Sequence, residues 1–513
     1  MTPPTNDLLA AFWAYERALM ANDLAGLDHW FLHGPDTLRA EGDTVLVGHA
    51  AIADFRRGRG GAPARVVERV HVVCPGPRVA VVTAETRRQD GTRGLQTQVW
   101  QHTDTGWRIA AAHVSGTAAP LPDERPDPAV WRVAGPLVKS SGRGPLAHVR
   151  TAVKDLFAVA GQRVGAGNPA WLAAARTEER HADAVRRLLD AGAELTGIAQ
   201  TDELAFSLAG ANAHYGTPVN PAAPGRITGG SSSGPAAAVA RGWADLGLAT
   251  DTAGSIRVPA SYCGLYGWRP THAATPTGGL LALAPSFDTA GLLARDPHVL
   301  RTAAQALLTT DEPSAPVTQL LVDNDLVALV EPEVLSSFEA ACRASALPVT
   351  RASTGISEHV EGWFDAFRTV QAAEAWEGHG AWITAHPDVL APDVAARFDN
   401  GRRVTPAQLA QAEQVLTEAG KLLDAVIPPG TALLLPATSG PAQLADAPPA
   451  EVEAVRAATL RLTCLASLAG LPAVVAPLLR VRSLPVGLCA LGARGTDRAL
   501  LDFITERTSP AHA

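Results

Sequence analysis

The stretch Thr228-Gly-Gly-Ser231-Ser-Ser-Gly decides the fold of this 513-residue chain, together with a second stretch, Asp251-Thr-Ala-Gly-Ser255-Ile-Arg257. Each places a serine among small residues, and the two serines lie 24 positions apart. The apolar run from Ala244 to Thr250 predicts a buried strand just before the second serine. Both serines are therefore expected on turns between a strand and a helix, as in an α/β fold.

Lys154 lies about eighty residues upstream, in the apolar run Ala-Val-Lys-Asp-Leu-Phe. It is one of only three lysines, since arginine supplies the rest of the 43 basic residues. Arginine keeps its proton in proteins, whereas a desolvated lysine can lose it. A lone lysine more often caps a strand or pairs with a neighbour such as Asp155. Followed by two glycine-rich serine motifs, however, Lys154 is interpreted as a base.

The lysine and the two serine motifs together resemble the amidase signature family. The resemblance continues through Asn212-Ala-His-Tyr-Gly-Thr-Pro218, Ser261-Tyr-Cys-Gly and Pro485-Val-Gly-Leu, and it covers about residues 132–508. It implies amide hydrolysis by a Ser/cis-Ser/Lys triad, with a cis peptide bond before Ser231. It also implies an α/β fold with a mixed central sheet flanked by helices.

The residues suggest a role for each group. A serine hydroxyl needs a base, and no His–Asp pair lies near either motif, so Lys154 is assigned as the base. Its pKa must fall by roughly 2 to 3 units from about 10.4. Ser231 is the expected proton relay and Ser255 the expected nucleophile. The backbone N–H groups of the turn formed by Thr252, Ala253 and Gly254 are expected to hold the oxyanion. No metal or cofactor is expected.

Residues 1–116 are expected to form a separate domain, followed by a proline-rich linker over 117–130 and the catalytic domain over 131–513. The predicted elements are helices over 8–20 and 50–55 and strands over 65–73, 78–88, 94–102 and 107–114, with turns at 89–92 and 103–106. This pattern resembles an α+β cone of the NTF2/SnoaL type, similar to the small domain fused to amidases of the bacterial cyanuric-acid pathway. Polar candidates inside the cone are Glu41, His71, Arg87, His102 and His113, none of which is assigned a catalytic role.

The composition limits the partners and the compartment that we expect for this protein. A net charge of −8 argues against a nucleic-acid partner. The sequence contains no run of eighteen apolar residues, so we expect no membrane span. Five scattered cysteines without ligand spacing predict a cytoplasmic protein. We expect a small-molecule amide substrate and a homodimer.

The substrate is left open between three alternatives. Gly167-Asn-Pro-Ala-Trp171 and Ser286-Phe-Asp-Thr resemble short plant-type amidases that cleave indole-3-acetamide, which favours a small linear amide. The fused cone and Ala253 favour a carboxylated urea or biuret, with the first domain assisting. A transamidase subunit is the third alternative. The family resemblance further implies that Trp363, Phe364, Phe367 and Trp376 line a substrate funnel, although an aromatic stripe on a helix more often belongs to the core.

Overall fold

The structure is a computed structural model that describes residues 6–41, 44–59, 65–88, 93–116, 126–310 and 315–508. The chain divides into two compact units, Met1–Arg125 and Pro126–Ala513. Most of the predicted linker, residues 117–125, and the predicted turn at 89–92 lie outside the described residues.

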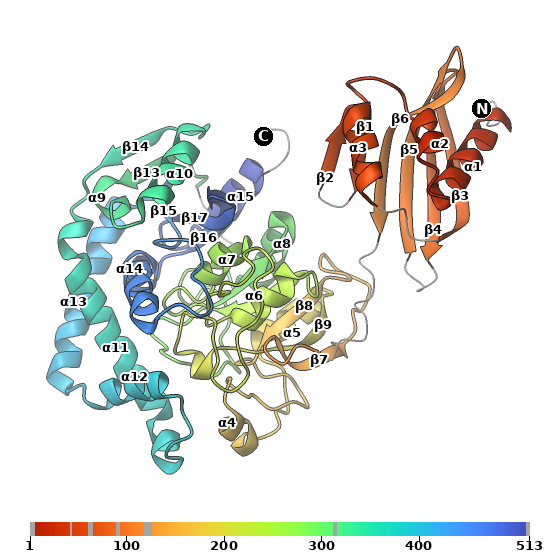
Figure 1. The fold of residues 1–513 in the computed structure, drawn as a ribbon. Coiled ribbons are helices and arrows are strands. Elements are labelled where there is room, and N and C mark those ends of the chain that lie inside the picture. Colours follow the sequence, from red (N-terminus) through yellow and green to blue (C-terminus); the bar gives the residue numbers. More distant parts are fainter. Residues whose placement is uncertain are drawn as a thin grey trace. The chain divides into compact units, whose positions relative to one another are not determined.

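The first unit is a six-stranded sheet with three helices packed on one face (Figure 1). The strand order is β2-β1-β6-β5-β4-β3, and neighbouring strands are antiparallel except for β1 and β6. Its elements are α1 (Asn6–Met20), α2 (Leu24–Trp30), β1 (Leu38–Glu41), β2 (Thr44–Val47), α3 (His49–Arg59), β3 (Arg65–Gly76), β4 (Val79–Arg88), β5 (Arg93–Thr103) and β6 (Gly106–Gly116).

The core of this unit lies between the helices and the sheet. Phe12 and Tyr15 of α1 pack with Trp100 and Ile109 of the sheet. Residues alternate along β4, where Ala80, Val82 and Ala84 are buried and their neighbours are not. This period-2 alternation is what one covered sheet face produces.

Two of the five polar residues expected inside the first domain lie on its surface, His102 is half-buried beside Trp107, and the side chains of Glu41 and Arg87 lie outside what the structure describes. His71 and His113 are exposed, and His71 pairs with Glu85 at 2.7 Å. The helix-covered face instead buries three arginines, Arg39, Arg56 and Arg65, beside Glu16. The prediction failed because alternation along a strand does not say which of its two faces the helices cover.

The second unit is built on a mixed sheet of eleven strands flanked by helices (Figure 1). The strand order is β14-β13-β15-β17-β16-β11-β12-β10-β8-β9-β7. Its strands are β7 (Trp131–Val138), β8 (Arg150–Lys154), β9 (Glu194–Ala199), β10 (Leu246–Thr250), β11 (Tyr266–Arg269), β12 (Ala290–Ala294), β13 (Gln319–Asp323), β14 (Val349–Ala352), β15 (Thr431–Pro436), β16 (Ala473–Val481) and β17 (Leu484–Leu491).

Four consecutive helices of this unit, α11 to α14, pack together, and α11 contacts the other three. The α-helices are α4 (Pro169–Ala174), α5 (Asp183–Asp190), α6 (Ser233–Ala240), α7 (Arg257–Cys263), α8 (Pro297–Leu307), α9 (Asn324–Val327), α10 (Pro332–Arg343), α11 (Ile356–Ala385), α12 (Pro392–Arg402), α13 (Pro406–Val426), α14 (Pro449–Leu468) and α15 (Asp497–Thr508). A 3₁₀ turn, η1 (Glu203–Ala205), follows β9.

Three neighbouring strands place the residues of the serine and lysine motifs. Strand β8 runs parallel to both β9 and β10, with Val153 opposite Leu248 and Lys154 opposite Ala199. The carboxyl ends of parallel strands meet at one edge of a sheet, which is where open α/β folds bind their ligands. Lys154 at the end of β8 therefore lies beside Thr250 at the end of β10.

Candidate active site

Lys154 is fully buried, and its amine contacts three hydroxyl groups. Its Nζ lies 2.8 Å from Ser231 Oγ, 2.9 Å from Ser232 Oγ and 2.7 Å from Thr250 Oγ1. Ser231 and Ser232 come from the loop that leads into α6, whereas Thr250 is the last residue of β10. The amine is thus fixed from two directions.

Burial lowers the pKa of Lys154 from its ordinary value of 10.5 to about 7. Desolvation disfavours the charged ammonium, and it outweighs the buried carboxylates of Asp202, Asp288 and Asp251, which favour the charge. From the residues alone we predicted that the pKa of Lys154 falls by roughly 2 to 3 units, which is close to this change. At neutral pH a large share of the molecules therefore holds a neutral amine with a free lone pair.

Ser231 lies between the amine and the second serine. Its Oγ is 3.1 Å from Ser255 Oγ, so hydrogen-bond distances connect Lys154, Ser231 and Ser255 without a break. All three residues are at least 97% buried. The peptide bond between Gly230 and Ser231 is cis.

Two glycines before Ser231 are required by their surroundings. Gly229 has φ +69°, a conformation that side chains disfavour. A Cβ on Gly230 would lie 2.2 Å from Asp202 Oδ2. Asp202 accepts hydrogen bonds from Ser233 Oγ at 3.0 Å and from the Gly210 N–H at 2.9 Å. The loop therefore closes directly onto a buried carboxyl group, whose pKa is raised by burial.

A buried carboxylate organises the turn that carries Ser255. Asp251 accepts hydrogen bonds from Arg257 at 2.8 Å and Arg269 at 3.0 Å, and all three side chains are buried. Burial alone would raise the pKa of Asp251, but the two guanidinium groups hold it well below its usual range. Asp251 and Arg257, the two charged residues of the second serine motif, thus form a structural ion pair, which Arg269 joins from β11.

Asp251 also accepts a hydrogen bond from one of the three backbone N–H groups that were expected to hold the oxyanion. The N–H of Gly254 donates to Asp251 Oδ1 at 2.9 Å. An amide that is already bonded inside the turn is not free to donate to a substrate, which leaves the N–H groups of Thr252 and Ala253. The Thr252 side chain points elsewhere, since its Oγ1 donates to Asp288 at 2.5 Å.

Comparisons with known proteins give the family of the chain. A family model described as Amidase matches residues 134–335, and one described as AtzH-like matches residues 5–119. Amidase 1 of Arabidopsis thaliana is 33% identical over 402 residues, which are 72% of this chain and 94% of that protein. The chain belongs to the amidase family. It is a hydrolase that acts on carbon–nitrogen bonds of amides.

Solved structures share the architecture of this amidase. The crystal structure of an amidase is 30% identical with a TM-score of 0.64, and the match covers 71% of this chain and 84% of that one. An inhibitor-bound vestigial protein complex, which reveals the evolutionary origins of an s-triazine catabolic enzyme, is 26% identical with a TM-score of 0.65. That match covers 72% of this chain and 85% of the other.

The expected cytoplasmic location is contradicted by further relatives of the amidase. The Translocon at the outer membrane of chloroplasts 64 of Pisum sativum is 28% identical over 391 residues, which are 70% of this chain and 65% of that protein. Free thiols report a reducing environment and not a compartment, which is why the cysteines could not decide this point. Among the described residues, no helix combines the length and the hydropathy needed to cross a membrane.

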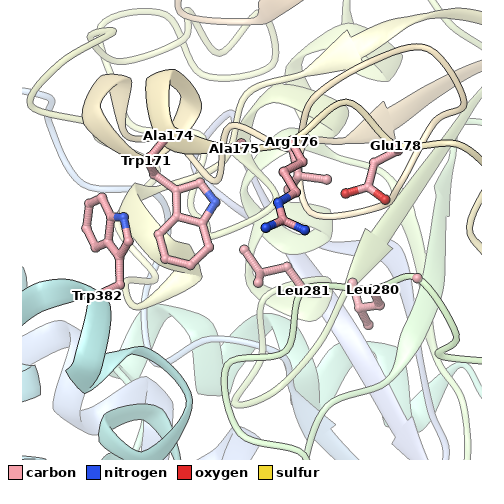
Figure 2. Close-up of a pocket in the computed structure, with 10 residues that line it drawn as sticks. Trp171, Ala174, Ala175, Arg176, Glu178, Leu280, Leu281 and Trp382 are labelled. Carbon is pink, nitrogen blue, oxygen red and sulfur yellow. The ribbon is translucent and has the colours of Figure 1, made fainter.

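A pocket of about 350 Å³ opens beside the segment that follows Lys154 (Figure 2). Trp171 and Trp382 form one wall, with ring centroids 4.8 Å apart, and Arg176 and Glu178 lie toward the other end. The N–H of Leu281, a lining residue, donates to the carbonyl of Leu156 at 2.9 Å. The pocket wall is therefore tied to the chain two residues beyond Lys154.

The aromatic residues expected in a substrate funnel do not line this pocket. Trp363, Phe364 and Phe367 are buried in the main core of the amidase unit, and Trp376 is partly buried in a smaller cluster. Sequence reasoning also missed Ser232 and Thr250. Thr250 ends the strand predicted before Ser255, but only the pairing of β8 with β10 in the fold brings it to Lys154.

Proposed function

We propose that the chain hydrolyses a small linear amide through an acyl-enzyme, with Ser255 as the nucleophile, Ser231 as the relay and Lys154 as the base. The observation that carries this proposal is the unbroken contact from Nζ to Oγ to Oγ at 2.8 and 3.1 Å. Two N–H groups of the neutral amine donate to Ser232 and Thr250, so its lone pair faces the Ser231 hydroxyl. Such a base is what a serine nucleophile requires.

The proposed reaction moves one proton along this chain in each direction. Ser255 Oγ forms a bond to the amide carbon while its proton passes to Ser231, and the proton of Ser231 passes to Lys154. The tetrahedral intermediate then breaks its C–N bond, and the nitrogen takes the proton back through Ser231 and leaves as ammonia. Water then attacks the acyl carbon while its proton passes through Ser231 to Lys154. The bond from that carbon to Ser255 Oγ breaks, Ser255 takes the proton back, and the acid leaves as the carboxylate.

The negative charge that forms on the carbonyl oxygen requires donors that are already in place. We assign this role to the backbone N–H groups of Thr252 and Ala253. One such donor typically contributes about 3 to 4 kcal/mol to stabilising the transition state. No step uses a metal ion, so treatment with EDTA is expected to leave the rate unchanged.

A fluorophosphonate label tests the assignment of the nucleophile. The label should modify Ser255 in the wild-type chain, as located by mass spectrometry of the labelled peptide. Lys154→Ala and Ser231→Ala should lose both labelling and amide hydrolysis, whereas the exposed Ser286→Ala should keep both. Modification of a serine other than Ser255 would overturn the proposal.

For the substrate, the pocket with Trp171 and Trp382 in one wall supports an amide with a flat aromatic group, such as an arylacetamide. Indole rings stack readily on planar ligands, and the two rings here are tilted by 58°. A panel of arylacetamides, aliphatic amides and ureides separates these classes. Trp382→Ala should raise KM for the aromatic amides more than for acetamide.

A second candidate is a carboxylated urea, handled with help from the first unit. This alternative is favoured by Arg56 in that unit, whose charged side chain is only 8% exposed. Glu16 bonds Arg65 at 2.9 Å, but no second acid is buried on this face of the described residues. Buried charges are normally paired, and Arg56 Nη2 and Gln98 Nε2 are buried without a hydrogen-bond partner. An anionic ligand would satisfy them.

Carboxylated ureas presented to the full chain and to Arg56→Gln distinguish the two candidates. If the first unit handles such substrates, the variant should lose turnover of the carboxylated urea and keep turnover of a simple amide. Equal turnover of both substrates by the variant would reject this second candidate.

We further propose that the first unit, over residues 1–116, is an NTF2-like cone that pairs two copies of the chain, joined by residues 117–130 to the catalytic domain 131–513. Val73, Val81 and Val99 lie opposite one another on β3, β4 and β5, on the face of the sheet that the helices do not cover. Light scattering should report a dimer, and Val81→Glu should shift it toward a monomer. A monomeric wild-type chain would reject the proposal.

A further inference from the structure

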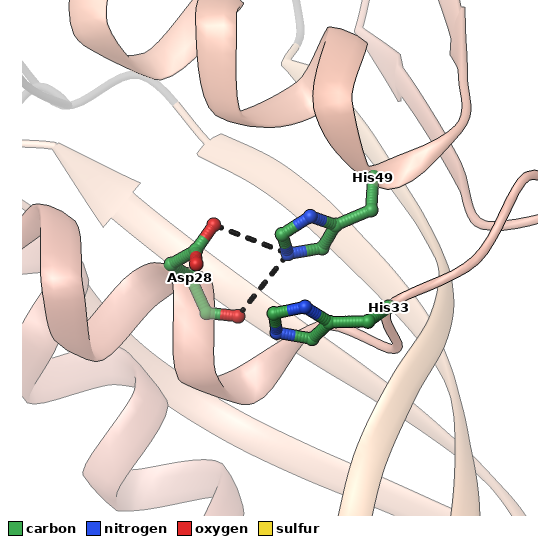
Figure 3. Close-up of side chains that lie close together, drawn as sticks. All are labelled: Asp28, His33 and His49. Carbon is green, nitrogen blue, oxygen red and sulfur yellow. Dashed lines mark hydrogen bonds and ion pairs between the residues drawn. The ribbon is translucent and has the colours of Figure 1, made fainter.

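Two histidines and one aspartate gather in the first unit (Figure 3). Asp28 lies on α2, His33 on the loop after α2, and His49 is the first residue of α3. One ligand atom from each residue lies within 4.8 Å of the other two, and His49 Nε2 is 3.1 Å from Asp28 Oδ1. We propose that these three side chains bind one divalent transition-metal ion such as Zn²⁺.

The spacing suits a single ion. Two ligands about 2.1 Å from a metal lie roughly 3.0 to 3.5 Å apart, which the pair of His49 and Asp28 already matches. His33 must approach by about an ångström, and its side chain is exposed and can rotate. Imidazole nitrogen and carboxylate oxygen together form a donor set typical of zinc and its neighbours.

Backbone hydrogen bonds hold the three segments together before any ion binds. The N–H of His49 donates to the carbonyl of Gly34 at 3.0 Å, so the two histidine segments are joined directly. The N–H of Leu32 donates to Ile109 on β6 at 2.9 Å, and that of Gly48 donates to Thr37 at 2.8 Å. A site fixed by its scaffold loses little entropy when the ion binds.

A hydrogen bond between His49 and Asp28 does not explain the position of His33. The two imidazole rings are stacked, with centroids 3.9 Å apart and planes 21° from parallel. The nitrogen lone pairs lie in the ring planes, so the exposed His33 ring must rotate out of the stack for both nitrogens to reach one ion. Arg56 also interacts with Asp28 and takes part of its negative charge, which moderates the expected affinity.

Three protein ligands leave at least one coordination position for water or a ligand atom. His33 is exposed, and the Asp28 side chain is 42% exposed, so this position faces solvent. The site is separate from the serine and lysine chemistry of the second unit, for which no metal is proposed. Its occupancy is therefore measured by metal binding and not by amide hydrolysis.

Cobalt titration of the untagged full-length chain tests the proposal. After treatment with EDTA and dialysis, Co²⁺ should bind with one ion per chain, give visible absorption bands, and be displaced by Zn²⁺. His33→Ala and His49→Ala should each weaken binding at least tenfold. His71→Ala, which removes an exposed histidine from the same unit, should bind like the wild type.

Circular dichroism shows whether each variant is folded, and His33→Ala is the decisive one because that side chain is exposed. Saturating Zn²⁺ should also raise the melting temperature of the wild-type chain but not that of folded His33→Ala. The proposal is overturned if the wild type takes up no stoichiometric ion, or if folded His33→Ala binds the ion as tightly as the wild type.

Discussion

A buried amine makes the activity of this amidase depend on pH at the scale of one residue. Burial brings the pKa of Lys154 to about 7, and only the neutral amine can accept a proton from Ser231. We therefore predict that kcat/KM for an uncharged amide rises with pH, reaches half its maximum near pH 7 and levels off above it. Initial rates between pH 5.5 and 9 measure this, and a profile that is flat or falls over that range would contradict the proposed base.

The same pKa predicts how stability changes with pH. Between pH 7 and 10.5 the unfolded chain holds a proton on Lys154 that the folded chain lacks, so the free energy of unfolding rises with pH. The gain between pH 7 and pH 9 is about 2 kcal/mol. Lys154→Met lacks this contribution, so the wild type should gain about that much stability relative to the variant.

Denaturant unfolding of both proteins at pH 7 and pH 9 measures the difference. Lys421→Met is the matched control, because Lys421 is exposed and pairs with Glu418 on the surface. Its stability relative to the wild type should not change with pH. An equal pH dependence in Lys154→Met and the wild type would mean that the buried amine stays protonated.

Motif spacing located the residues of the candidate site better than it described their bonds. Lys154, Ser231 and Ser255 could be predicted, because a neutral base and two hydroxyls are chemical requirements visible in the sequence. The contacts of Lys154 with Ser232 and Thr250 depend on the register of β8 against β10, which no local pattern encodes. The bond from Gly254 to Asp251 is likewise a product of the folded turn.

At the scale of elements, the turn between β10 and α7 depends on one charge. Asp251 pairs with two buried arginines and accepts backbone N–H bonds from Gly254, Ile256 and Arg257. Removing one partner of a buried ion pair costs about 3 to 5 kcal/mol. We predict a loss of this size in Asp251→Asn, together with loss of amide hydrolysis because Ser255 lies on the same turn.

Asp245→Asn is the control for this prediction. Asp245 also pairs with two arginines, Arg150 and Arg295, but these side chains are 30% to 41% exposed. Pairs near the surface are worth about 0 to 1 kcal/mol. Thermal or denaturant unfolding should therefore separate the two variants by several-fold in lost stability, and similar losses would mean that burial does not govern the turn.

Long elements, along which the hydrophobic pattern repeats several times, were predicted well, whereas three short elements were missed. The predicted helix over 8–20 is α1, and the strands predicted over 65–114 correspond to β3 to β6. The structure adds α2, β1 and β2, which have seven or four residues each and too few positions to show a period.

At the scale of the whole molecule, each unit has a hydrophobic core of its own. Core residues of the first unit come from α1 to β6, and those of the large cluster come from residues 130–504. Sequence patterns predicted the mixed sheet of the second unit, because strands and helices alternate along it. They could not predict the compartment, since cysteine content and hydropathy describe the chain and not its destination.

Because Lys154, Ser231 and Ser255 all lie within the second unit, that unit should act without the first. We predict that a fragment of residues 126–513 folds and hydrolyses a small linear amide with kcat/KM within about threefold of the full chain. The side-chain hydrogen bonds of the three residues, and the carboxylates that act on Lys154, all come from residues 154–288, which the fragment keeps. Steady-state kinetics of the two proteins, with Ser255→Ala in the fragment as the inactive control, measures the ratio. A folded fragment that lost activity a hundredfold would show that the first unit completes the amidase site, and it would favour the carboxylated urea over the simple amide.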